Sequence, residues 1–186
     1  MTHREALEVL AAVRGDCVVV TTMGSVAHWP RLSDTPRDFF YQPSSMGQAV
    51  PLALGLALAK PGLGVVVVTG DGGLLMNLGC LVTLAQHRVP VTVVLIDNGL
   101  YEVTGGQPVP GAGTTDFAGL AIASGIRQVV AFDTLADWRA GAAGCLATAG
   151  PSFVWLKVRG ETGLPTPKSP RPMAEQIARL RTALGN

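Results

Sequence analysis

The 186-residue chain has few cysteines and few charges, and both shortages exclude classes of protein. Its three cysteines, Cys17, Cys80 and Cys145, are scattered, odd in number and without a CxxC pair. This pattern gives little support to a disulfide framework, a zinc site or an iron–sulfur cluster. Charged residues make up only 15% of the chain, and 14 Lys and Arg against 13 Asp and Glu leave a net charge of +1. Because a nucleic-acid binder needs a basic face, no nucleic-acid partner is expected.

The chain also lacks a long uninterrupted apolar run. Its most apolar stretch, 51–69, is broken by a lysine, a proline and two glycines, whereas a membrane-spanning helix needs about 20 continuous apolar residues. Segment 1–14 carries charges among its apolar residues and so lacks the core of a signal peptide. We therefore expect no membrane association and a cytoplasmic location.

Short β-branched runs alternate with longer helical patterns, and hydrophobic residues reach 48% of the chain. This alternation predicts a three-layer α/β/α sandwich with a mostly parallel sheet. We expect the main domain over 1–160, and a proline-rich connector with a C-terminal helix over 161–186. The predicted strands are 17–22, 39–42, 65–69, 91–96, 128–131 and 152–158. The predicted helices are 7–13, 47–59, 74–88, 117–124, 134–149 and 173–184, with a loop at Gly24 and Ser25 and a long loop over 97–116.

Glycines and side chains able to bind a metal ion follow two of the predicted strands. Gly70-Asp71-Gly72-Gly73 follows the strand 65–69, and Asp97-Asn98-Gly99 follows the next strand. The interval from Asp71 to Asn98 is 27 residues (98 minus 71). Ligands gather beyond the carboxyl ends of parallel strands, where glycine-rich turns let a phosphate approach the backbone. A carboxylate beside a phosphate is repulsive unless a cation lies between them, and Mg²⁺ prefers such oxygen ligands. Either turn alone is usually structural, but their spacing lets Asp71 and Asn98 share one metal ion.

This stretch resembles the thiamine diphosphate motif, which runs from Gly-Asp-Gly across one helix and one strand to Asn-Asn. The resemblance implies that Asp71, the Asn98 side chain and the Leu100 carbonyl hold Mg²⁺, which in turn holds the diphosphate. Asp97 stands where the family usually has its first asparagine. Because the ligand is normally the second asparagine, the metal site is expected to persist.

Two further segments match the same family in the same order. Ser44-Ser45-Met46-Gly47 resembles the segment that bends the cofactor into a V shape, with Met46 as the wedge and the Ser44 carbonyl accepting from the 4'-amino group. The turn 22–25 matches a loop that contacts the diphosphate. The cofactor-binding residues implied by the resemblance are Met23, Gly24, Ser25, Ser44, Met46, Gly70, Gly72, Gly73, Asn98 and Tyr101.

Within the family, the segments 70–77 and 104–108 look most like decarboxylases of sulfopyruvate and phosphonopyruvate, which act on short 2-oxo acids with an anionic head. Sulfopyruvate decarboxylase is found as two separate chains. Family members need a glutamate from a pyrimidine-binding domain, and no second α/β domain fits within 186 residues. The resemblance therefore implies a pyrimidine-binding partner chain of similar size, in a hetero-oligomer built on dimers.

The candidates for substrate contact are His28, Tyr101, Glu102 and Gln107. His28 can equally be a solvated loop histidine, and the other three can instead order the long loop. His3 is expected at the surface. Arg31 and Arg37 can attract an anionic substrate or be simply solvated.

Three alternative functions stay open at this point. An acetolactate-synthase-like carboligase would normally need flavin and a longer chain. A ferredoxin-coupled 2-oxo acid oxidoreductase would want clustered cysteines. A noncatalytic phosphate- or nucleotide-binding module would keep the fold without meeting a pyrimidine domain.

Overall fold

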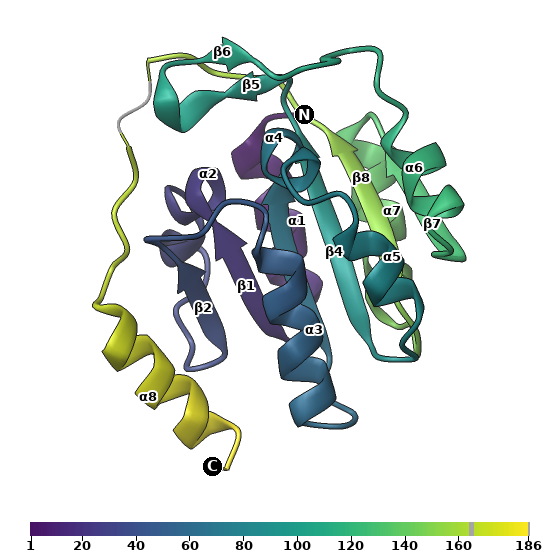
Figure 1. The fold of residues 1–186 in the computed structure, drawn as a ribbon. Helices are drawn as coiled ribbons and strands as arrows, with labels where there is room; N and C mark the ends of the chain where they lie inside the picture. Colours follow the sequence, from purple (N-terminus) through teal and green to yellow (C-terminus); the bar gives the residue numbers. More distant parts are fainter. Residues whose placement is uncertain (164–165, 186) are drawn as a thin grey trace.

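The computed structural model describes residues 1–163 and 166–185 and shows a sheet of six parallel strands (Figure 1). The strand order is β2-β1-β3-β4-β8-β7, and every pairing within this sheet is parallel. The strands are β1 (Val18–Thr22), β2 (Asp38–Tyr41), β3 (Val65–Gly70), β4 (Val91–Asp97), β7 (Gln128–Phe132) and β8 (Ser152–Lys157). All six predicted strands are confirmed, with ends that shift by one residue, and the mostly parallel sheet is confirmed with them.

Helices cover both faces of this sheet, as predicted. α3 (Ala49–Ala59), α5 (Cys80–Ala85) and α6 (Phe117–Ala123) pack on one face, and α1 (His3–Val13) and α7 (Leu135–Leu146) pack on the other (Figure 1). Side chains alternate along a strand, so Val65 and Val67 enter the α3 layer while Val66 and Val68 enter the α1 layer. Both faces of the central strands are therefore apolar, which explains their uninterrupted valine runs.

Three connections differ from the prediction. The helix expected over 74–88 is two short helices, α4 (Asp71–Leu75) and α5, because Asn77 interrupts it and its side chain donates to the Gly47 carbonyl at 3.1 Å. The loop expected at Gly24 and Ser25 is a short helix, α2 (Met23–Val26). The long loop contains an antiparallel pair, β5 (Leu100–Tyr101) and β6 (Gln107–Pro108), around the short helix η2 (Glu102–Thr104).

The C-terminal helix α8 (Met173–Ala183) lies along the edge strand β2 (Figure 1). The Gln176 side chain accepts a hydrogen bond from the Phe40 N–H at 2.8 Å, and Leu180 enters the core. This helix therefore covers a sheet edge that would otherwise be open. Residues 164–165 of the predicted connector, and residue 186, lie outside the described residues, and the division at residue 160 stays a prediction. Within the described ranges, no helix has the length and apolar character needed to cross a bilayer.

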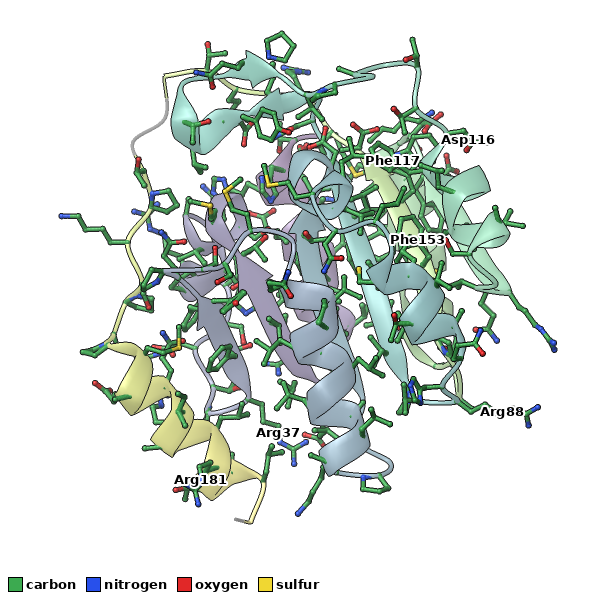
Figure 2. All side chains as sticks on the ribbon, viewed as in Figure 1. Arg37, Arg88, Asp116, Phe117, Phe153 and Arg181 are labelled. Atoms are coloured by element: carbon green, nitrogen blue, oxygen red, sulfur yellow. The ribbon has the colours of Figure 1, made fainter. Side chains whose placement is uncertain are left out.

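The carboxyl ends of β1, β3 and β4 meet at one edge of the sheet, where α2, α4 and the β5–β6 pair lie together (Figure 1). Arg37, Arg88 and Arg181 project at the opposite end of the molecule (Figure 2). The predicted attraction of an anionic substrate by Arg37 is therefore wrong for a ligand at the carboxyl edge, because Arg37 precedes β2 and lies at its amino end.

Candidate functional site

The tips of β3 and β4 are joined by the carboxylate of Asp71. Gly70 pairs with Ile96 in the sheet, so the residues that follow them start side by side. Asp71 accepts one hydrogen bond from the Gly72 N–H at 2.9 Å and another from the Gly99 N–H at 2.8 Å. The side chain that the sequence assigns to the metal is thus fixed by backbone donors from both loops.

This carboxylate is buried, with 2% of the residue exposed. Burial, together with the nearby Asp97 carboxylate, raises the pKa of Asp71 to about 7, although the hydrogen bonds from Gly72 and Gly99 oppose the shift. Within residues 1–163 and 166–185, no Lys or Arg forms an ion pair with Asp71. A buried carboxylate without a cationic partner is costly, so this position favours a bound cation.

The residues around Asp71 fit a magnesium ion. Asn98 and Leu100 line the same cavity as Asp71, and the Asn98 side-chain oxygen accepts from the Leu100 N–H at 2.9 Å. A carboxylate, a side-chain amide and a backbone carbonyl are the hard oxygen donors that Mg²⁺ takes alongside substrate phosphates. The described part of the chain contains no cluster of three or more His, Cys, Asp or Glu side chains able to hold a metal. A metal at this edge would therefore need the amide, the carbonyl and ligand oxygens to complete its shell.

One cavity at the carboxyl edge brings together every residue that the sequence assigned to cofactor or metal. These residues come from four separate segments, which follow β1, precede α3, follow β3 and follow β4. They are Met23, Gly24, Ser25, Ser44, Met46, Gly70, Asp71, Gly72, Gly73, Asn98, Leu100 and Tyr101. Their individual roles toward a ligand stay predictions.

Two glycines in this cavity are required by close contacts. A Cβ on Gly72 would lie 2.2 Å from Cε1 of Tyr101, so the tyrosine ring rests directly on the Gly72 backbone. Gly47 has a φ of +79°, and a Cβ there would lie 2.9 Å from the Cβ of Asn77. The turn before α3 and the segment after α4 are therefore packed together through a position that only glycine fits.

Of the four candidates for substrate contact, the structure brings two to the cavity. Tyr101 and Glu102 line it, and the Glu102 carboxylate accepts from the Glu161 N–H at 2.8 Å. Burial raises the pKa of Glu102. Gln107 is exposed on β6, where its amide donates to the Thr104 carbonyl at 2.9 Å and so orders the loop. His28 does not line the cavity. The catalytic roles of all four stay predictions.

His3 is a titratable residue of the cavity that the sequence does not predict. It was expected at the surface, but it is buried and lines the cavity, with Nε2 3.0 Å from the Ser25 hydroxyl. Its ring contacts His28 edge-on, with 5.2 Å between centroids. Burial lowers the pKa of His3 to about 3. The capping box of Thr2 and Glu5 marks the start of α1 in the sequence, but no local signal shows that this start lies against α2.

A protein-family model for the thiamine pyrophosphate enzyme, C-terminal TPP binding domain, matches residues 21–156. The chain is 40% identical over 160 residues to phosphonopyruvate decarboxylase of Streptomyces hygroscopicus, and the aligned region covers 85% of this chain and 39% of that relative. It is 37% identical over 157 residues to sulfopyruvate decarboxylase subunit beta of Methanothermobacter thermautotrophicus, and the aligned region covers 83% of this chain and 80% of that subunit. The chain thus spans about two-fifths of the first relative and most of the second.

Solved structures show the same fold. The chain matches the thiamine diphosphate-dependent 4-hydroxybenzoylformate decarboxylase of Rhodococcus jostii with a TM-score of 0.66 and 25% identity, over 85% of this chain and 32% of that one. It matches the benzoylformate decarboxylase of Polynucleobacter necessarius with a TM-score of 0.73 and 21% identity, over 87% of this chain and 34% of that one. The second likeness supports the fold alone.

Proposed function

Because the chain belongs to the thiamine pyrophosphate enzyme family, as a C-terminal TPP binding domain, we propose that it is the diphosphate- and Mg²⁺-binding subunit of a 2-oxo acid decarboxylase. One observation carries the proposal. Asp71, Asn98 and Leu100 line one cavity, and Asp71 bridges the two strand tips that hold them.

In this proposal each part of the cavity wall has a separate task. Asp71, Asn98 and the Leu100 carbonyl would hold Mg²⁺, and the backbone around Gly70–Gly73 would face the diphosphate. Met46 and Ser44 would orient the rest of the cofactor, while the Tyr101 ring packs against the Gly72 backbone. When bound, thiamine diphosphate supplies an electron sink for the carbanion that decarboxylation leaves.

The proposal includes a second, pyrimidine-binding chain, and the surface over α3 supports it. α3 has no charged or polar side chain, and it packs beside α5. Large apolar side chains stay exposed on this side of the sheet: Met46 (40%), Leu58 (47%), Met76 (49%) and Val82 (50%). Such a surface is typical of a protein–protein interface. The name of the sulfopyruvate decarboxylase relative, a subunit beta, agrees with a two-chain enzyme.

The substrate class in this proposal is a short 2-oxo acid with an anionic head. It is supported by the names of the relatives, which decarboxylate phosphonopyruvate and sulfopyruvate. Both names share a three-carbon 2-oxo acid and differ in the phosphonate or sulfonate group. We therefore expect a substrate panel to separate pyruvate derivatives with an anionic head from plain 2-oxo acids.

The test combines binding with turnover. The full chain is titrated calorimetrically with thiamine diphosphate, with and without Mg²⁺, alone and with a candidate pyrimidine-binding chain. The reconstituted pair is then assayed for CO₂ release on phosphonopyruvate, sulfopyruvate and pyruvate. Mg²⁺-dependent binding with release of CO₂ supports the proposal. Binding without turnover of any 2-oxo acid by the pair favours the noncatalytic module, and absence of binding by the pair refutes the proposal.

A further inference from the structure

The N-terminal helix brings a buried histidine to the cofactor cavity. His3 and Ser25 both line the cavity, both are buried, and Nε2 of His3 lies 3.0 Å from Oγ of Ser25. Ser25 belongs to α2, in the segment 22–25 that the family resemblance assigns to diphosphate contact, whereas His3 is 22 residues earlier in the chain. The matched family segment begins at residue 21, so the helix that supplies His3 lies outside it.

His3 is held in place from two directions. The Arg159 N–H donates to the Met1 carbonyl at 3.0 Å, which ties the chain before α1 to the segment after β8. Trp138 of α7 donates to the Ala6 carbonyl at 3.0 Å and fixes the first turn of α1 from the other side. The backbone on both sides of His3 is thus held in place, with the imidazole beside Ser25.

Gly24 lets the ring approach the turn closely. A Cβ on Gly24 would lie 3.3 Å from Cε1 of His3 and 3.8 Å from a carboxylate oxygen of Glu102. Three separate segments therefore converge on one glycine at the cavity wall. The α2 backbone, the imidazole and the Glu102 carboxylate therefore form one packed group around Gly24, and the imidazole in this group reaches the Ser25 hydroxyl.

The imidazole in this group is neutral. Burial keeps the pKa of His3 far below its ordinary value, and the charge of the neighbouring His28 adds to this effect. The charged groups around this pair are Glu102, which packs on Gly24, and Glu161, Arg4 and Arg31, whose charges act on His28. A neutral imidazole has one N–H donor and one acceptor nitrogen. If Nε2 donates to the Ser25 oxygen, the single Ser25 proton is free for another acceptor.

We propose that His3 is a positioning residue that donates through Nε2 to Ser25 and so directs the Ser25 O–H toward an oxygen of the bound diphosphate. The inference rests on the proposed function for the identity of the anion. A hydroxyl that donates to a charged oxygen forms one of the stronger hydrogen bonds, and a hydroxyl committed to the imidazole would instead present lone pairs to the anion. The direction of the His3–Ser25 bond therefore decides whether Ser25 attracts the diphosphate.

The first test measures the affinity of thiamine diphosphate with Mg²⁺ by calorimetry, using the full chain with its pyrimidine-binding partner. Ser25→Ala and His3→Phe are each expected to weaken binding by about 10-fold. His3→Gln, whose amide can donate in place of Nε2, is expected to recover most of the loss. The double variant is expected to bind no more weakly than either single variant, because both remove one interaction. Additive losses, or unchanged affinity in His3→Phe, would overturn the proposal.

The second test needs no cofactor. Nitrogen-15 NMR of the histidine ring in the full chain is expected to show His3 protonated on Nε2 and unchanged in charge between pH 5 and 8. Protonation on Nδ1 alone would mean that Nε2 accepts, and would overturn the proposal. If the wild-type pair shows no Mg²⁺-dependent binding, the proposed function fails and the NMR experiment still decides the His3–Ser25 direction.

Discussion

The carboxylate of Asp71 accepts a hydrogen bond from the Gly99 N–H at 2.8 Å, so the tips of β3 and β4 are held together by the residue proposed to bind Mg²⁺. The same carboxylate accepts from the Gly72 N–H at 2.9 Å. Both oxygens are therefore oriented before any ligand arrives. A preorganised ligand of this kind lowers the cost of ordering on binding.

Replacing Asp71 tests the metal site. Asp71→Ala is expected to weaken Mg²⁺-dependent retention of thiamine diphosphate by more than about 100-fold, because even outer-shell changes at metal sites cost about 10- to 100-fold. The far-ultraviolet circular dichroism spectrum should stay unchanged. Retention is measured by gel filtration of the loaded protein followed by a thiamine assay.

Asp97→Asn is the matched control for Asp71→Ala. It removes a carboxylate from the same edge and restores the asparagine usual in the family, and its amide oxygen can still accept from Trp155, whose indole N–H now donates to Asp97 at 2.8 Å. We expect retention close to wild type in Asp97→Asn. Equal losses in the two variants, or normal retention in Asp71→Ala, would place the metal elsewhere.

The contact between Gly72 and Tyr101 gives a second prediction. Since an added Cβ at Gly72 would lie 2.2 Å from the tyrosine ring, Gly72→Ala must displace that ring. Overpacking of this kind costs roughly 1–3 kcal/mol in the free energy of unfolding. The cost should largely disappear when Gly72→Ala is made in a Tyr101→Ala background. Urea denaturation of the four proteins in this cycle gives the coupling, and a cost independent of Tyr101 would contradict the contact.

The burial of His3 predicts a pH dependence of stability. Its pKa is lowered from 6.5 to about 3 in the folded chain, so below pH 6.5 the unfolded chain binds a proton that the folded chain does not. Stability must therefore fall as the pH falls from 6.5 toward 3, by about 2 kcal/mol between pH 7 and 5 from this group alone.

The measurement is urea denaturation at pH 7, 6 and 5. His3→Gln should flatten the dependence. Burial also lowers the pKa of His28, but His28 is only half-buried, so His28→Gln should remove less of the dependence. A profile in His3→Gln that is as steep as in wild type would show that the ring is protonated in the folded chain.

The fold could be predicted from the sequence because its central strands are buried on both faces. A run such as Val65–Val68 is apolar at every position, which is typical of a central parallel strand and is rare elsewhere. The spacing between Asp71 and Asn98 was informative for a related reason. The sequence predicts one helix and one strand in this interval, and although the helix is divided into α4 and α5, the unit with β4 returns the chain to the same edge of the sheet.

The features that could not be predicted depend on contacts between distant segments. His3 is buried only because the start of α1 lies against α2, and nothing in residues 1–14 encodes that neighbour. The break between α4 and α5 depends on the bond from Asn77 to Gly47, 30 residues away. Gln107 and Glu102 are both polar residues of the same long loop, so the sequence does not distinguish their positions. The antiparallel pairing of β5 and β6 turns Gln107 outward.

The exposed apolar surface over α3 and α5 gives the last prediction. Val82 on α5 and Ile177 on α8 are exposed to a similar extent, 50% and 45%, but only Val82 lies on the surface proposed to meet the pyrimidine-binding chain. Val82→Glu would bury an unpaired carboxylate at that interface and is expected to weaken association by at least about 10-fold. Ile177→Glu should leave association unchanged, because α8 lies along β2 at the far edge of the sheet (Figure 1). Sedimentation velocity of each variant mixed with the partner chain measures the affinity. Equal effects of the two substitutions would argue that the interface lies elsewhere, whereas a loss confined to Val82→Glu would place it on the α3–α5 side.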